Sequence, residues 1–198
     1  MQHIFPAIDT PRLILRCVAE HDAEHLSALM SPGVSRWVAS WTSPLPVDKA
    51  RGLIARARKA AEDGKALPMI VERKSDGAVV GWIAVNGGPE AKGTFGYWLG
   101  EAFHGQGFMR EAAPIALAHG FQRLGLVLIG AGAQLGNAAS LAVMKACGMR
   151  HIDDRMIYAP SRERDELCAW YEITAAEFAA RRKTESRLGL SRRSCAGA

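Results

Sequence analysis

Residues 94–124 read TFGYWLGEAFHGQGFMREAAPIALAHGFQRL, and the period of the hydrophobic residues changes within them. Thr94–Leu99 alternates aromatic and small residues, which is typical of a strand. Glycines punctuate the turn that follows. From Met109 to Leu124 the apolar residues recur at steps of three and one, which predicts a long helix with one apolar face. Pro114 lies inside this helix and should kink it unless tertiary packing absorbs the lost hydrogen bond.

A strand, a glycine-rich turn and a helix N-terminus can together hold a phosphate group. The first turn of a helix leaves backbone N–H groups unpaired and carries about half a positive charge, so an anion there gains hydrogen bonds and dipole energy. Gly105 and Gly107 would let the backbone approach such an anion closely. On glycine spacing alone, a plain turn with positive φ angles is an equal alternative.

Two other phosphate motifs can be compared with the chain. Gly100–Gly105 has the glycine spacing of a P-loop, but Gln106 and Gly107 stand where that motif needs Lys and Ser or Thr. The segment Gly130–Gly136 is closer to a dinucleotide fingerprint, because its glycines follow an apolar run and precede a predicted helix. Its third glycine comes one residue too late. A nicotinamide-dependent enzyme that uses Gly130–Gly136 is therefore kept as a minority hypothesis.

The segment His104–Met109, HGQGFM, resembles the pyrophosphate-binding motif of the GNAT acetyltransferase superfamily, written Gln/Arg-x-x-Gly-x-Gly/Ala. Here His104 replaces Gln or Arg, and Met109 replaces the small last residue. Asn137–Met149 is similar to the Asn-x-x-Ser…Lys-x-Gly-Phe segment of the RimJ/RimL branch, which acetylates the N-termini of ribosomal proteins. The opening strand and helix, TPRLILRCVAEHDAEHLSALM, also resemble that branch. The resemblance covers residues 9 to about 180.

The resemblance implies an α/β (α+β) fold of the acetyltransferase type. The expected sheet is mixed, mostly antiparallel, of about seven strands, flanked by helices and splayed between strands 94–99 and 126–133. The chain pattern agrees, because a helix between these two strands lets them lie parallel. Apolar runs bounded by turn residues predict further strands at 67–72, 79–86, 152–158 and 166–173.

The resemblance further implies an enzyme that moves the acetyl group of acetyl-CoA directly to a primary amine, either a protein N-terminus or a small-molecule amine. Such a reaction depends mainly on positioning, because an α-amino group with a pKa of about 8 needs only a weak base. No metal is expected. A non-catalytic regulatory domain that binds coenzyme A or a nucleotide stays open as an alternative, beside the nicotinamide-dependent enzyme.

The same resemblance implies roles for individual residues. A backbone donor near Trp98 and Leu99 would bind the thioester oxygen. Ser140, together with Asn137, would protonate or hydrogen-bond the departing thiolate, and Glu101 is the nearest carboxylate for a general base, although a solvated loop residue is the simpler interpretation. The implied coenzyme contacts are Trp98, Leu99, His104, Gly105, Gln106, Gly107, Phe108, Met109, Arg110 and Asn137.

Trp37 and Trp41 lie in a loop rich in Pro and Ser, residues 32–46. This loop joins the two helices where the resembling family places its acceptor-binding wall. The two tryptophans could line a pocket for the amine substrate. Packing of helices onto the sheet is the favoured interpretation, because aromatic residues mostly supply buried area.

The formal net charge of +5 belongs to the C-terminal end, because residues 181–198 hold six Lys and Arg but one acidic residue. We expect one domain over residues 1–182 and a basic, disordered tail over 183–198, where no apolar period continues. Specific nucleic-acid binding is not expected, because the basic residues form no face of the fold.

Cysteine pattern and hydropathy predict the compartment. The four cysteines form no Cys-x-x-Cys pair, the N-terminus lacks a signal-peptide pattern, and no apolar run approaches the roughly 20 residues of a membrane helix. A cytoplasmic protein without membrane contact is expected. An amine acceptor is its expected partner, and a homodimer is left open.

Overall fold

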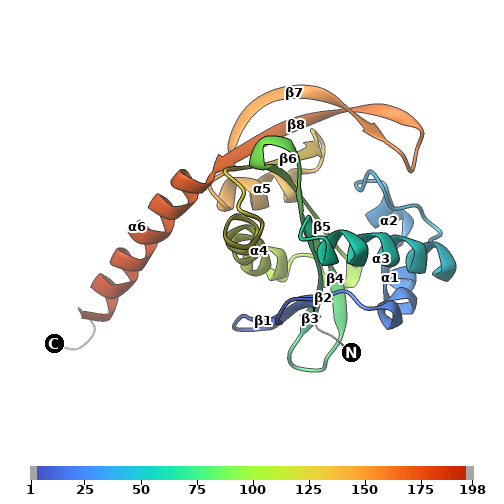
Figure 1. Cartoon of the computed structure of the whole chain (residues 1–198), viewed down its shortest axis with the longest axis horizontal. Helices are drawn as coiled ribbons and strands as arrows, with labels where there is room; N and C mark the ends of the chain where they lie inside the picture. Colours follow the sequence, from blue (N-terminus) through green and yellow to red (C-terminus); the bar gives the residue numbers. More distant parts are fainter. Residues whose placement is uncertain (1–3, 195–198) are drawn as a thin grey trace.

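The structure is a computed structural model that describes residues 4–194. Within these residues, eight strands form one sheet in the order β1-β2-β3-β4-β5-β6-β8-β7 (Figure 1). All neighbouring strands are antiparallel except β5 and β6, which are parallel. This mixed sheet with flanking helices confirms the predicted fold class. It has one strand more than expected, because the short β1 had no recognisable pattern.

The predicted strands and helices are present, with ends that differ by a few residues. The strands are β1 (Ile8–Asp9), β2 (Leu13–Cys17), β3 (Ala66–Arg73), β4 (Val79–Gly87), β5 (Lys92–Leu99), β6 (Leu128–Gln134), β7 (Arg150–Ala159) and β8 (Arg164–Thr174). The helices are α1 (Ala23–Leu29), α2 (Pro32–Ser35), α3 (Val47–Glu62), α4 (Phe108–Leu124), α5 (Ala138–Ala146) and α6 (Ala175–Ser194), with short 3-10 turns η1 (Glu20–Asp22), η2 (Pro89–Ala91) and η3 (Glu101–Phe103).

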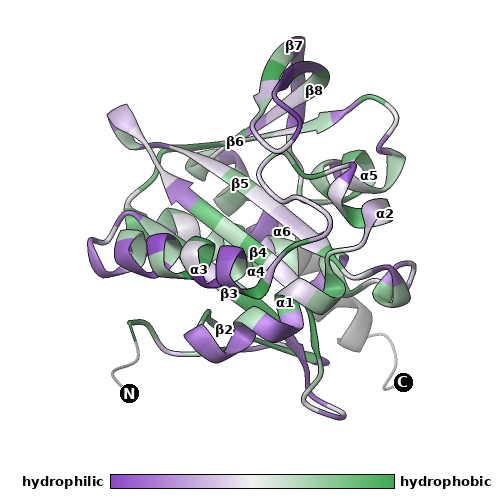
Figure 2. Cartoon of the chain, turned by 90° about the vertical axis from the view of Figure 1, so that its right-hand side faces the viewer, coloured by the Kyte–Doolittle hydropathy of each residue, from purple (hydrophilic) through white to green (hydrophobic). Residues whose placement is uncertain are grey.

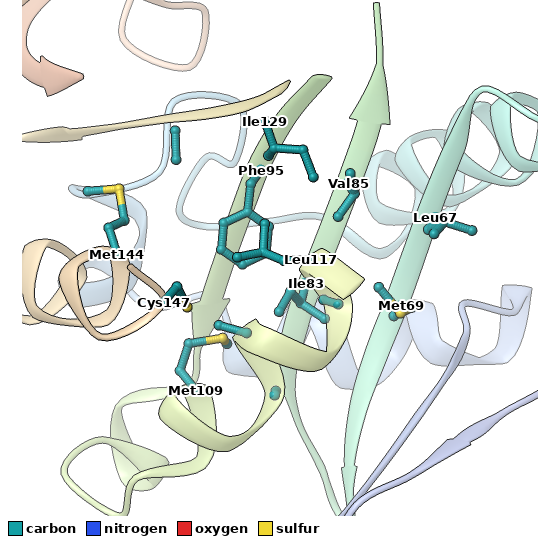
Figure 3. Packing of buried hydrophobic residues seen from close by; sticks show 14 of the residues in the cluster. Leu67, Met69, Ile83, Val85, Phe95, Met109, Leu117, Ile129, Met144 and Cys147 are labelled. Atoms are coloured by element: carbon teal, nitrogen blue, oxygen red, sulfur yellow. The ribbon is translucent and has the colours of Figure 1, made fainter. Parts of the chain in front are cut away.

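Side chains on the two faces of the sheet form two cores. Helices α1 and α3 cover one face, and α4 and α5 cover the other (Figure 1). Figure 2 shows hydrophobic residues in β4 and many hydrophilic residues on α3. The larger core lies under α4, where Ile83, Val85, Phe95, Leu117 and Ile129 pack together (Figure 3). Such close-packed apolar layers supply most of the stability of a domain of this size.

Helix α4 continues through Pro114 without a break. The residues around the proline, Ala112, Ala113, Ala116 and Leu117, are fully buried. Packing of this face against the sheet therefore offsets the hydrogen bond that the proline cannot make.

The sheet opens between β5 and β6. The two strands pair only at three positions, Lys92 with Leu128, Gly93 with Ile129, and Thr94 with Gly130. Farther along, β5 remains paired with β4, and β6 remains paired with β8. This confirms the splay predicted between strands 94–99 and 126–133. It leaves one edge of each strand without a neighbour at the centre of the molecule.

The C-terminal end of the described residues is helical. Helix α6 runs from Ala175 to Ser194 (Figure 1) and so extends past Lys183, where the sequence predicts that the tail begins. The helix starts at a capping box, in which Thr174 and Glu177 bond to each other's backbone N–H groups. Extending a helix that has already formed is far easier than starting one, and no proline follows. Residues 195–198 of the predicted tail lie outside the described residues.

No helix in the described part of the chain combines the length and the hydrophobicity needed to cross a membrane.

Candidate active site

A cavity of about 770 Å³ lies where β5 and β6 separate. It is bounded on one side of the sheet by the loop before α4 and by α5. On the other side it is bounded by the loop after α2 and by β4, β7 and β8. Every predicted coenzyme residue except Gln106 lines it, as do Ser140, Trp37 and Trp41. The structure thus brings together residues that are up to about a hundred positions apart in the chain.

The loop before α4 has the geometry of an anion-binding turn. Gly105 and Gly107 have φ angles of +73° and +76°, in the left-handed region that favours glycine. The backbone N–H groups of Gly105, Gln106 and Gly107 have no hydrogen-bond partner within residues 4–194. Helix α4 begins at Phe108, so its own first N–H groups lie beside them. This loop therefore combines positive φ angles, as in a plain turn, with unpaired N–H groups of the kind that bind a phosphate.

Arg12, which directly precedes β2, contacts this loop through hydrogen bonds. Its guanidinium group donates to Glu111 Oε2 at 2.7 Å and to the Gln106 carbonyl oxygen at 2.9 Å, and lies 4.9 Å from the centre of the Phe108 ring. Thr10 Oγ1 also donates to Glu111. Although burial opposes it, these hydrogen bonds lower the pKa of Glu111. Arg12 and Glu111 are 99 positions apart, so no local sequence pattern identifies the pair.

Two predicted coenzyme residues instead stabilise the turn itself. His104 Nε2 lies 3.0 Å from the Leu99 carbonyl oxygen, and Gln106 Nε2 donates to the Ala102 carbonyl oxygen at 2.9 Å. Met109, which stands where the family motif has a small residue, is 5% exposed and packs in the larger core (Figure 3). The core thus accommodates most of the longer side chain.

Ser140 forms a hydroxyl pair with a residue that the sequence analysis missed. Its Oγ lies 2.9 Å from the phenolic oxygen of Tyr97, which also donates to the Ser140 carbonyl oxygen at 3.0 Å. Burial raises the pKa of Tyr97, so the phenol stays protonated at neutral pH. The strand alternation of Thr94–Leu99 is a signal that could have found Tyr97, because it places this residue on the same face as Phe95. Asn137 caps α5 by accepting a hydrogen bond from the Ser140 N–H.

Glu101 does not line the cavity. Its carboxylate accepts a hydrogen bond from Ser31 Oγ at the start of α2 and lies against Gly33. The structure therefore does not bring the predicted general base to the site. Of the described residues that line the cavity, none is Asp, Glu or Lys.

All five tryptophans of the chain line the cavity, and we call the part that they enclose the aromatic chamber: Trp37, Trp41, Trp82, Trp98 and Trp170. Trp41 is buried and packs edge to face on Trp82 and Trp98, with ring centres 5.2 Å apart in each pair. This agrees with the packing interpretation for Trp41. Trp37 is only half-buried.

The glycines of the alternative dinucleotide motif have another role. Gly130 and Gly132 lie inside strand β6. A Cβ atom on Gly130 would collide with the Trp170 ring, and one on Gly132 would collide with Ile157 and crowd that ring. A dinucleotide fingerprint needs its glycines in the turn between a strand and a helix. The structure therefore contradicts a pyrophosphate site at Gly130–Gly136.

A family model described as an acetyltransferase (GNAT) domain matches residues 12–150. The chain belongs to the GNAT acetyltransferases. Among relatives of this GNAT protein, the uncharacterized N-acetyltransferase YoaA of Bacillus subtilis is 24% identical over 149 residues, which cover 74% of this chain and 84% of YoaA.

Solved structures of other GNAT proteins share the fold. RimJ of Mycobacterium smegmatis, solved with CoA-disulfide, matches with a TM-score of 0.74 and 24% identity over 89% of this chain and 91% of RimJ. RimL, a ribosomal L7/L12 alpha-N-protein acetyltransferase solved with coenzyme A, matches with a TM-score of 0.73 and 20% identity over 85% of this chain and 98% of RimL. At these identities the matches show that the chain shares the fold of RimJ and RimL.

Proposed function

We propose that this GNAT acetyltransferase moves the acetyl group of acetyl-CoA directly to a primary amine. The observation that carries the proposal is a single cavity that extends from the Gly105–Gly107 loop, through the gap between β5 and β6, into the aromatic chamber. One end offers free N–H donors, and the other offers room for an acceptor. Two substrates entering from opposite faces of the sheet would meet in the gap.

The residues present fit the coenzyme. Unpaired N–H groups at Gly105 and Gly107, beside the start of α4, suit the pyrophosphate. The edge of β5 beyond Thr94 has no neighbouring strand and suits the amide groups of the pantetheine arm, which can pair with a strand edge. The RimJ and RimL structures of the same fold were solved with CoA-disulfide and coenzyme A.

The hydroxyl pair supplies a proton for the leaving group. The nitrogen of a neutral amine attacks the thioester carbon, and the carbon–sulfur bond then breaks to release a thiolate. Ser140 Oγ would donate its proton to this sulfur, and Tyr97, which burial keeps protonated, would replace it by turning its one proton from the Ser140 carbonyl oxygen to Ser140 Oγ. With no carboxylate among the lining residues that the structure describes, the proton of the amine would leave through water to the solvent. A weak base suffices for an amine with a pKa of about 8.

RimL acts, by its name, on the N-terminus of a ribosomal protein, which supports a protein N-terminus as one acceptor class; small-molecule amines are the other. A cytoplasmic location, the absence of specific nucleic-acid and membrane partners, and the domain division at residue 182 stay predictions. Ser140, Asn137 and the ten coenzyme residues are likewise proposed roles, while Glu101 is no longer our candidate base.

Calorimetric titration and thermal shift with acetyl-CoA, coenzyme A, NAD and NADP test the proposal, followed by an assay of coenzyme A release with a panel of amines. We expect stabilisation by acetyl-CoA and coenzyme A, and release that depends on an amine. Stabilisation by NAD alone would contradict the proposal. Binding of acetyl-CoA without release from any amine would favour a non-catalytic coenzyme-binding domain.

A further inference from the structure

Two half-buried tryptophans in the aromatic chamber lie against glycines, and one of them occupies space that the glycines leave free. The Trp170 ring lies on Gly130 and Gly132 of β6, and its Nε1 donates to Glu172 at 2.8 Å, which fixes the ring plane. Trp37 lies beside Gly136, where a Cβ atom would come within 3.6 Å of the ring. The glycines of β6 therefore make room for the Trp170 ring, whereas Trp37 is in ordinary contact distance of Gly136.

The three other tryptophans close the chamber from the side of the α1–α3 helices. Trp41, Trp82 and Trp98 are each at most 7% exposed and form one edge-to-face group. The indole N–H of Trp98 is buried and has no hydrogen-bond partner among the residues that the structure describes. The chamber thus consists mainly of rigid aromatic walls, which favour a flat, apolar ligand group.

The charges around the chamber disfavour a second positive charge on the acceptor. The described lining residues include no Asp or Glu, and their only arginine, Arg110, lies at the coenzyme end. Arg36 lies 4.4 Å from the centre of the Trp37 ring, and Arg155 lies 4.8 Å from that of Trp170. A cation therefore already occupies one face of each half-buried ring. A polyamine would lose hydration here without gaining a carboxylate partner.

Hydrogen bonds hold the chamber walls together. Arg162, at the tip of the β7–β8 hairpin, donates to the carbonyl oxygens of Ser35 and Val38 at 2.8 and 3.1 Å, and the Ser161 N–H donates to that of Ala39 at 2.9 Å. Figure 1 shows this hairpin tip beside the loop that follows α2. Glu166 is engaged by Arg162 at 2.6 Å, so it is not free to bind an amine. The walls are therefore in place before an acceptor enters.

We propose that the acceptor is a monoamine whose amino group is carried next to an uncharged aromatic ring, and that this ring binds in the aromatic chamber. The inference rests on the proposed function, because it names the acceptor of that reaction. A small arylalkylamine and a peptide with an aromatic N-terminal residue present the same chemistry. The amine nitrogen would extend from the ring toward the gap between β5 and β6, where Ser140 lies.

The test compares kcat/KM of the full-length protein with acetyl-CoA and matched amines. The panel holds 2-phenylethylamine, 2-cyclohexylethylamine of the same size without aromaticity, 1,4-diaminobutane, and two peptides that differ only in N-terminal Phe or Asp. We expect kcat/KM of at least one aromatic substrate to exceed that of its matched control by about tenfold or more, which is the usual effect of a single well-formed contact. If 2-phenylethylamine is the better substrate, the acceptor is a small amine, and if the Phe peptide is better, the acceptor is a protein N-terminus.

Equal rates for matched pairs, or preference for the diamine or the Asp peptide, would overturn the inference and leave the acetyltransferase proposal standing. Failure of every amine to release coenzyme A would instead overturn the proposed function, and the acceptor inference with it.

Trp37→Ala tests the chamber directly, because this half-buried side chain can be removed with less loss of core than Trp41. We expect KM for the preferred aromatic amine to rise by about tenfold while acetyl-CoA affinity and the melting temperature stay close to those of the unaltered protein. Trp37→Phe, which keeps an aromatic ring, should restore much of the affinity. An unchanged KM in a folded Trp37→Ala variant would refute the proposed binding mode.

Discussion

The phenolic oxygen of Tyr97 and Ser140 Oγ lie 2.9 Å apart and join β5 to α5 at the edge of the cavity. The phenol also holds the Ser140 carbonyl oxygen, so the serine is fixed through both its backbone and its side chain. Burial keeps Tyr97 protonated by raising its pKa. The serine hydroxyl is therefore held at the cavity beside a protonated phenol.

Ser140→Ala should lower kcat by about 5- to 150-fold, the effect of losing one hydrogen bond of about 1–3 kcal/mol to a leaving group. Acetyl-CoA affinity should change little, which titration calorimetry checks. If Tyr97 acts through Ser140, Tyr97→Phe should slow the unaltered enzyme but have little further effect on Ser140→Ala. A Ser140→Ala variant with unaltered kcat would rule out the proposed role.

Gly107→Glu should weaken acetyl-CoA binding by several kcal/mol, roughly the value of a charge placed against a phosphate at a helix start. Arg12 Nη2 lies 3.5 Å from the position of the new Cβ atom and can hold the introduced carboxylate in place. Because the φ angle of +76° strains most side chains, Gly107→Asn is the control, since Asn tolerates this region. Calorimetry and melting curves separate lost binding from lost stability. Unchanged affinity in folded Gly107→Glu would mean that the loop is only a structural turn.

The ion pair between Arg162 and Glu166 predicts a pH dependence of stability. The hydrogen bond from Arg162, opposed by burial and aided by Arg164, lowers the pKa of Glu166 to about 2. A carboxyl group whose folded pKa lies below its unfolded value of about 4.5 stabilises the fold above that pH, and the contribution is lost as the pH falls toward 2. In Glu166→Gln, the unfolding free energy should therefore fall by about 1–3 kcal/mol less between pH 5 and pH 2 than it does in the unaltered protein. Asp165→Asn in the same hairpin is the control, and equal slopes for all three proteins would contradict this role.

The start of α6 packs on the body of the protein, whereas the predicted tail lies beyond it. Phe178 is 5% exposed and its ring centre lies 5.5 Å from that of Phe121. Truncation after Arg182 should keep acetyl-CoA affinity and shift the melting temperature by only a few degrees, because this contact remains. Truncation before Phe178 should lower stability by about 2–5 kcal/mol through loss of a buried aromatic residue. Thermal melts and calorimetry on both truncations check this, and loss of coenzyme binding in the first would show that the end of α6 is structural.

The parts of the site that the sequence predicted are those carried by local pattern. Strand, turn and helix follow one another within residues 94–124, so the order of residues along the chain is enough to locate the loop with its two glycines that we propose binds the coenzyme. The pairs Arg12–Glu111 and Tyr97–Ser140 could not be predicted, because their members are 99 and 43 positions apart and only the sheet brings them together. Glycine spacing also has no unique meaning, since glycines inside a strand can make room for a ring as well as for a phosphate.

The hydrogen bonds from Arg162 to the loop after α2 also determine when the two halves of the cavity can form during synthesis of the protein. Arg162 and Ser35 are 127 positions apart in the chain. By contrast, the Gly105–Gly107 loop and the Arg12–Glu111 ion pair beside it need no residue after Glu111. Chains emerge from the ribosome N-terminus first. A nascent chain that ends before residue 162 therefore contains the Gly105–Gly107 loop, but it lacks the arginine whose hydrogen bonds hold the loop after α2 against the β7–β8 hairpin. The residues that close the aromatic chamber are therefore made after those that form the Gly105–Gly107 loop.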